Sequence, residues 1–221
     1  MKDMLRSFRI FTGNYTLKTV FQMLLAFVAV FAAITLLSLI PVEDESFAEG
    51  FLTAFLPAFS LFLPLCGVFL LNAIYSYNNP ITPGFKYFHS LPDSDTAYAQ
   101  AIAAANLFTL IIMVLGVTGH YIYSVFAPFP LSPMISAALA LLTTGITNFI
   151  GNVKNQWVRI FSVMPIFCLA GFASGFSSAM LEDGERIPDT VIWISLGVAI
   201  AVYVAGLVYA LATCKKKWRR E

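Results

Sequence analysis

Charged residues are scarce in this chain. Of 221 residues only 11% are Asp, Glu, Lys or Arg, whereas 59% are hydrophobic and the mean hydropathy is +0.80. Soluble domains carry about 25% charged residues, so the composition excludes a soluble globular protein. It predicts an all-α integral membrane protein, because continuous apolar runs without period-two alternation satisfy their backbone groups in lipid only as helices.

Cysteine and histidine are also rare. Cys66, Cys168 and Cys214 are isolated, with no CxxC pair, which argues against a disulfide framework or a zinc site and predicts small buried hydrophobic side chains. The two histidines, His89 and His120, are expected on opposite faces of the membrane, where they cannot share a metal. We therefore expect this chain to hold no metal ion and no cofactor.

Sequence motifs of catalysis are missing as well. The chain has no GxxxxGK[ST] phosphate loop, no HExxH and no pair of carboxylates on a membrane helix, so it does not hold a nucleotide in the P-loop manner. One enzyme-like combination has to be weighed: Ser177 and Ser178 follow Gly175 at the same expected depth as His120, and a Ser–His dyad activates a nucleophile. Serine is common in membrane helices, so we favour packing residues and expect no enzyme.

Six apolar runs are long enough to cross the hydrocarbon core of a bilayer, which takes about 20 residues in a helix. The fourth run begins among closely spaced prolines, which leaves open a re-entrant segment in place of a crossing. We expect a six-helix transmembrane domain over residues 19–213. Its runs are about Thr19–Ile40, Phe51–Tyr75, Ala97–Val117, Leu131–Ile150, Ile160–Met180 and Val191–Thr213.

The two ends of the chain are basic. In residues 1–15, Lys2, Arg6 and Arg9 lie opposite a set of apolar side chains at helical spacing, which predicts an amphipathic helix in the headgroup layer. That apolar set is Met1, Met4, Leu5, Phe8 and Phe11. Residues 214–221 form a basic tail, which we interpret as a flank that contacts anionic lipid and not as a nucleic-acid site.

Charge in the loops predicts the orientation. Twelve of the thirteen Lys and Arg residues fall at the termini or in the second and fourth loops, and Arg186 is the exception. The first and fifth loops hold acidic clusters, at 43–49 and 182–189. By the positive-inside rule, both termini are cytoplasmic and the acidic loops face outward.

No Asp, Glu, Lys or Arg lies inside any of the six runs. Ion-coupled transporters and charge-selective channels use such residues, so both classes are disfavoured. The amides Gln22, Asn72, Asn106 and Asn148 are expected to bridge helices. Small residues at four-residue steps predict close packing within a bundle or across a dimer: Ala29 and Ala33, Ala101 and Ala105, Gly171 and Gly175, and Gly197, Ala201 and Ala205.

The second loop, residues 76–96, is the only long polar interruption that the charge pattern places in the cytoplasm. It contains the helix stops Pro80, Pro83 and Pro92. Between the last two prolines the pattern predicts a short amphipathic helix that presents Phe85, Phe88 and Leu91 together to a partner. The alternative is an aromatic belt at the membrane interface. The third membrane helix follows, with a cap expected from Asp93, Ser94 or Asp95.

These features together resemble the permease subunit of type-2 ABC exporters. The resemblance covers nearly the whole chain in layout and rests locally on Gly84-Phe85-x-x-Phe88-x-Ser90-Leu91-Pro92. It implies that residues 76–96 carry the coupling helix that seats in a cleft of a separate ABC ATP-binding subunit. The contact residues it implies are Phe85, Tyr87, Phe88, Ser90, Leu91 and Pro92.

The resemblance also implies a mode of action. Two permease chains form a dimer in the plasma membrane and export a hydrophobic or amphipathic cargo, such as a peptide, a lipid-like molecule or a drug. A function of a different class stays open, namely a non-transporting membrane scaffold or assembly protein whose second loop recruits a cytoplasmic partner.

Overall fold

The computed structural model describes most of the chain in five stretches, at residues 2–12, 67–78, 84–124, 132–151 and 187–218. It also describes separate positions, which are 21, 22, 25, 29, 153, 155, 157–159, 161, 162, 164, 165, 168, 172, 176 and 180. Every regular element over these residues is helical, and none of them lies in a strand. The expected all-α class is confirmed for this part of the chain.

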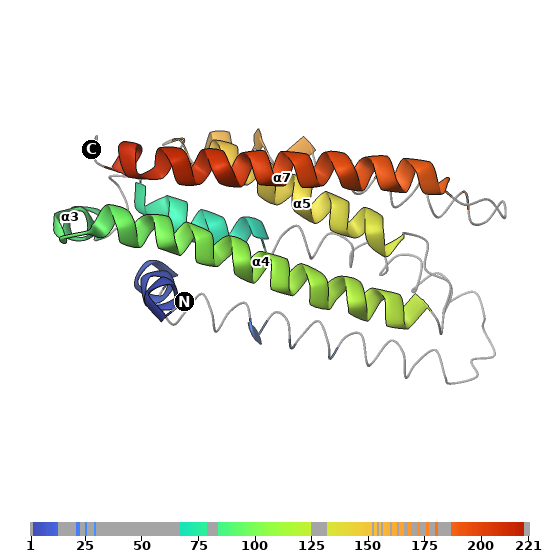
Figure 1. The fold of residues 1–221 in the computed structure, drawn as a ribbon, viewed down its shortest axis with the longest axis horizontal. Helices are drawn as coiled ribbons and strands as arrows, with labels where there is room; N and C mark the ends of the chain where they lie inside the picture. The colour runs from blue at the N-terminus through green and yellow to red at the C-terminus, as the bar shows by residue number, and fades with distance from the viewer. Residues whose placement is uncertain are drawn as a thin grey trace.

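Three long helices dominate the structure (Figure 1): α4 (Ser94–Ser124), α5 (Pro133–Ile150) and α7 (Asp189–Trp218). Each contains a stretch long and apolar enough to cross a membrane, and in α4 that stretch is Ser94–Gly119. This is therefore a membrane protein with three candidate spans among the described residues.

The expected runs 97–117, 131–150 and 191–213 correspond to these three helices. α4 and α7 extend beyond the apolar runs at both ends, where polar residues are also part of the helix. The expected runs 19–40, 51–75 and 160–180 lie largely outside the described residues, although residues 67–75 are helical and continue into the short turn η1 (Ser76–Asn78). Six crossings stay a prediction.

The proline-rich start of the fourth run is a helix start. Ser132 is the N-cap of α5 and its Oγ accepts a hydrogen bond from the backbone N–H of Met134, while Pro133 takes the first helical position. Proline suits this position, because its missing N–H would have no partner there. α5 then runs without a break to Ile150, so the structure favours the crossing over the re-entrant alternative.

α5 and α7 touch along their backbones where two glycines meet. A Cβ added at Gly145 would lie 2.8 Å from the Cα of Tyr203, and one added at Gly206 would collide with the carbonyl oxygen of Gly145. Close backbone approach of this kind is what small residues allow between membrane helices. The four-residue spacing of small residues indicates Gly197 and neither of these two glycines, yet an added Cβ at Gly197 has nothing within 4 Å. The expected packing of Ala101 and Ala105 agrees with their full burial.

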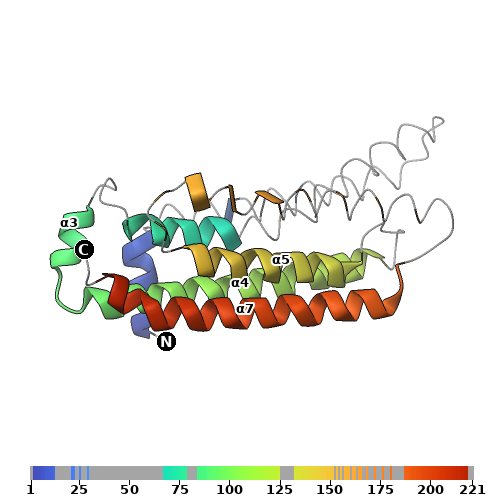
Figure 2. The same cartoon turned by 90° about the horizontal axis from the view of Figure 1, so that it is seen from above.

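One end of the bundle gathers segments that are far apart in the sequence. α4 begins there, whereas α5 and α7 end there, so α4 is antiparallel to the other two (Figures 1 and 2). The helix over residues 2–12 crosses this end steeply and packs Phe8 and Phe11 into the core. The helix over residues 2–12, α3 (Phe85–Ser90), Arg159 and the last turn of α7 thus lie at one end of the described bundle. Which side of the membrane this end faces stays a prediction.

Candidate functional site: the junction at helix α3

The predicted short helix between the second and third runs exists as α3 (Phe85–Ser90). Gly84 precedes it with φ 85°, a left-handed conformation that glycine adopts at little cost. The N–H of Phe88 closes the first turn on the Gly84 carbonyl at 2.9 Å. Leu91 is extended and ends the helix, because the residue before a proline is disfavoured in the helical region. Pro92 therefore stops the helix, as expected.

α4 begins directly after this stop. Asp93 has φ 57°, a left-handed turn residue between the two helices. Its carbonyl oxygen accepts hydrogen bonds from the N–H groups of Thr96 and Ala97, each at 3.0 Å. The buried Asp95 carboxylate lies in the first turn and accepts from the N–H of Thr96 at 2.8 Å, where negative charge favours the helix N-terminus. Three residues, Leu91, Pro92 and Asp93, separate α3 from α4.

The inner side of α3 is attached to the body by two rings. Phe88 is partly buried, with ring centroids 4.9 Å from Tyr77 and 5.5 Å from Phe11. His89 stacks on Trp218 at the end of α7, with centroids 3.7 Å apart and an angle of 16° between the ring planes. α3 is therefore held by the N-terminal helix and α7 as well as by its link to α4.

The structure places the residues predicted to contact a partner on different sides of α3 and the turn after it. Tyr87 is 64% exposed, and Ser90 and Pro92 are exposed, so these three lie outward. Leu91 is half-buried. Phe88 packs against the body, so the sequence-based expectation that Phe88 is presented with Phe85 and Leu91 needs correction. The side chain of Phe85 lies outside the described part. The sequence pattern could not separate these roles, because both faces of α3 carry aromatic residues.

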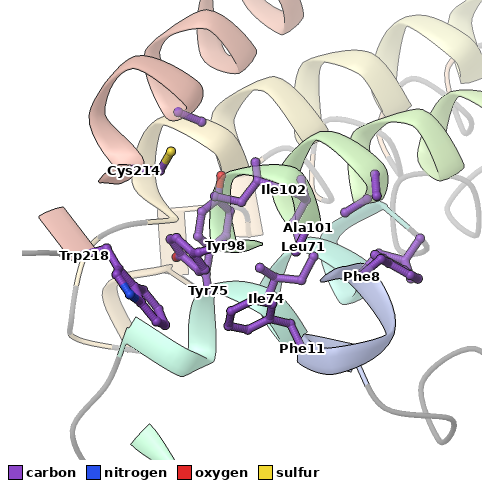
Figure 3. Packing of buried hydrophobic residues seen from close by; sticks show 14 of the residues in the cluster. Phe8, Phe11, Leu71, Ile74, Tyr75, Tyr98, Ala101, Ile102, Cys214 and Trp218 are labelled. Atoms are coloured by element: carbon purple, nitrogen blue, oxygen red, sulfur yellow. The ribbon is translucent and has the colours of Figure 1, made fainter. Parts of the chain in front are cut away.

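Behind α3 lies an aromatic cluster that joins the helix ends (Figure 3). Phe11 is at its centre, with centroids 5.5 Å from Tyr98 and 5.7 Å from Trp218. Tyr98 and Trp218 stack at 4.4 Å, and the indole N–H of Trp218 donates to Ser94 Oγ at 2.9 Å. We call this set, with Tyr77, Phe88 and His89, the α3 junction. Each such ring pair contributes about 0.5–1.5 kcal/mol beyond the burial of its area.

Trp218, like Tyr77 and Tyr98, is a member of the junction that the sequence did not indicate. Its position among lysines at the end of α7 suggested a lipid-facing flank, yet it is only 3% exposed and lies between His89 and Tyr98. Its neighbour Lys215 donates to Thr96 Oγ1 at 3.2 Å. The last turn of α7 is thus fastened to the start of α4. The only sequence feature that could have indicated this burial is a single tryptophan within a basic tail.

A buried polar network lies one layer deeper, between the helix at 67–75, α4 and α5. Tyr75 donates its hydroxyl to Asn148 Oδ1 at 3.0 Å. Asn106 and Asn148 exchange amide hydrogen bonds of 3.2 Å and 2.8 Å, and all three side chains are buried. The prediction that Asn106 and Asn148 bridge helices is confirmed. Gln22 is exposed and Asn72 half-buried, and neither shows a bridge of this kind in the described part.

Arg159 is a buried cation near the end of α5. It is 5% exposed, and its Nη1 donates to the carbonyl oxygen of Gly151 at 3.4 Å. Burial lowers the pKa of its guanidinium from the ordinary value, and arginine stays charged even so. Cationic charge is favoured beside the carbonyl end of a helix, so Arg159 stabilises the end of α5.

The enzyme-like combination is not tested by this structure, because Ser177, Ser178 and the side chain of His120 lie outside the described residues. Cys214 is buried and Cys168 exposed, and both are free thiols. Within the described stretches no cluster of three His, Cys, Asp or Glu residues is placed to hold a metal ion. Comparisons with protein-family models, curated proteins and solved structures found no match for this chain.

Proposed function

We propose that this chain is the membrane-spanning permease subunit of an ATP-driven ABC exporter, and that α3 is its coupling helix. The observation that carries the proposal is the α3 junction. A six-residue helix at the end of the bundle is connected to α4 by a short turn and to α7 and residues 2–12 by stacked rings. A push on α3 therefore reaches three other helical segments at once.

The mechanism follows from this connection. ATP binding closes a pair of separate ATPase subunits, and each moves the α3 seated on it. The α3 junction passes that movement to α4 and α7, which rock so that a pathway between two permease chains opens to the other side. Energy enters through contact and not through a charge in the membrane, which agrees with the lack of Asp, Glu, Lys and Arg inside the apolar runs.

The outward side of α3 is the surface we assign to the ATPase contact. Tyr87 is its largest exposed side chain, and Lys86 and Ser90 lie beside it. Exposed aromatic residues are enriched among those that dominate binding energy at protein interfaces. Phe88 has a different part in the proposal, since it links the contacted helix to Phe11 and Tyr77.

Cargo and assembly are parts of the same proposal. α7 leaves large apolar side chains uncovered within one chain, among them Trp193, Ile194 and Val208. Such a face suits lipid or a second permease copy, and a pathway beside it suits a hydrophobic or amphipathic cargo. We assign the complex to the plasma membrane, with the α3 junction in the cytoplasm.

Co-purification tests the proposal. The tagged chain is solubilised from its native membranes, and bound proteins are identified by mass spectrometry. We expect a cassette ATPase with the native chain and at least tenfold less with Tyr87→Asp. Tyr121→Asp is the matched control, because Tyr121 is 65% exposed and lies near the far end of α4. It should retain the ATPase.

Two results would contradict the proposal. Recovery of no ATPase with the native chain, together with a different cytoplasmic protein that Tyr87→Asp releases, would favour the scaffold function. Equal recovery of the ATPase with Tyr87→Asp and Tyr121→Asp would mean that α3 is not the contact surface.

A further inference from the structure

The helix over residues 2–12 has a second face that the rest of the described chain leaves uncovered. Lys2, Arg6 and Arg9 are all exposed, and their spacing of four and three residues puts them in one stripe, opposite Phe8 and Phe11. Asp3 is the only acidic residue on this helix, so its charge stays positive. In the described part of the chain, none of the three cations forms an ion pair or a side-chain hydrogen bond.

Apolar side chains flank this stripe on both sides. Leu5 is 39% exposed and Ile10 is 41% exposed. Leu5 lies at the edge of the apolar face that carries Phe8 and Phe11, and of these three only the two rings are pressed against the body. Cations between exposed apolar residues are typical of helices that lie at the boundary of headgroups and acyl chains.

The position of Lys2, Arg6 and Arg9 along the bundle axis also supports a place at the boundary of headgroups and acyl chains. The 5.7 Å contact of Phe11 with Trp218 puts the N-terminal helix level with the last turn of α7. There Lys217 turns back, with its Nζ 5.2 Å over the ring of Tyr209 and 3.4 Å from the Tyr209 hydroxyl. Lys215, Lys216 and Lys217 in this last turn form a basic flank of the kind that anionic headgroups attract. Figure 2 shows the N-terminal helix crossing the bundle at that level.

We infer that the outer face of this helix, formed by Lys2, Arg6 and Arg9 with Leu5 and Ile10, binds the headgroups of anionic phospholipids. Phe8 and Phe11 already hold the helix backbone in place, so lipid binding has to order only the side chains of the three cations and not the helix that carries them. Each cation near an anionic surface strengthens binding about fivefold. This surface is separate from the outward side of α3, and the inference does not depend on the transport function.

The test uses the full-length chain in detergent. Native mass spectrometry follows the titration of phosphatidylglycerol, and phosphatidylcholine with the same acyl chains serves as the neutral probe. We expect Arg6→Gln/Arg9→Gln to bind phosphatidylglycerol roughly 25-fold more weakly, from two cations at about fivefold each, with phosphatidylcholine unchanged. Arg6→Lys/Arg9→Lys keeps the charge and should stay within about threefold of the native chain.

A control variant, Lys86→Gln, removes an exposed cation from α3 and should leave the affinity unchanged. The inference is overturned if Arg6→Gln/Arg9→Gln keeps the native affinity for phosphatidylglycerol, or if Lys86→Gln weakens it equally. Should the double variant lose both lipids because it fails to fold, Arg9→Gln alone carries the test, with an expected loss of about fivefold for phosphatidylglycerol only.

Discussion

Phe11 is the residue whose replacement most directly tests the α3 junction. Its side chain is 2% exposed, and its ring lies 5.5–5.7 Å from four others, those of Tyr77, Phe88, Tyr98 and Trp218. Replacing a buried Phe by Ala costs about 3–5 kcal/mol in soluble cores. Four ring pairs at about 0.5–1.5 kcal/mol each fall in a similar range. The two figures describe the same contacts and are not added.

We expect the loss to act locally, because lipid keeps the long helices formed while the N-terminal helix and α3 come loose. A local cost of about 3 kcal/mol raises the detached population about 100-fold. Hydrogen exchange followed by mass spectrometry measures it: the hydrogen-bonded backbone amides of residues 6–12 and 88–90 should exchange about 100-fold faster in Phe11→Ala. Amides in the middle of α5 should keep the native rate.

Ile10→Ala is the control, since Ile10 is on the same helix and 41% exposed. Phe11→Leu keeps most of the volume, and swaps of this kind cost below about 1.5 kcal/mol, so it should fall between the two. The reasoning fails if Phe11→Ala and Ile10→Ala accelerate exchange equally, or if α3 exchanges at the native rate in Phe11→Ala. Either result would mean that Phe11 does not hold the segments together.

Two further predictions concern the helix interfaces. Asn148→Ala leaves the Tyr75 hydroxyl and the Asn106 amide without their hydrogen bonds to Asn148, and we expect the free energy of unfolding, measured by thermal unfolding, to fall by about 1–3 kcal/mol. The double variant Asn106→Leu/Asn148→Leu should cost less than the sum of Asn106→Leu and Asn148→Leu. A strictly additive result would speak against a shared network. Gly206→Ala should lower the unfolding temperature, because its Cβ would meet the backbone of Gly145. Gly197→Ala is the control, since an added Cβ there meets nothing within 4 Å, and it should be neutral. Equal effects of the two variants would show that the backbones of α5 and α7 do not touch at Gly206.

The ends of α3 were predictable from the sequence because local sterics decide them, whereas α4 and α7 extend beyond their expected runs at both ends. Gly84 permits the left-handed residue before α3, Pro92 forces Leu91 out of the helical region, and Ser132 with Pro133 starts α5. None of these effects needs a distant partner. That Asn106 and Asn148 bridge helices was predictable for a related reason, since an amide in an apolar helix requires a polar partner. That they pair with each other was decided by the packing of α4 on α5.

The amino-acid sequence by itself therefore determined that this is a membrane protein, that it is helical, and where α3 begins and ends. Tertiary structure decided which side of each helix faces inward, as with Phe88, Trp218 and the pair Gly145 and Gly206. In lipid an apolar side chain is equally acceptable outside the bundle and inside it, so hydrophobicity does not mark the inner face of α5 or α7. On α3 both faces carry aromatic residues, so hydrophobicity does not mark its inner face either. Only the fit of one helix against another selects it.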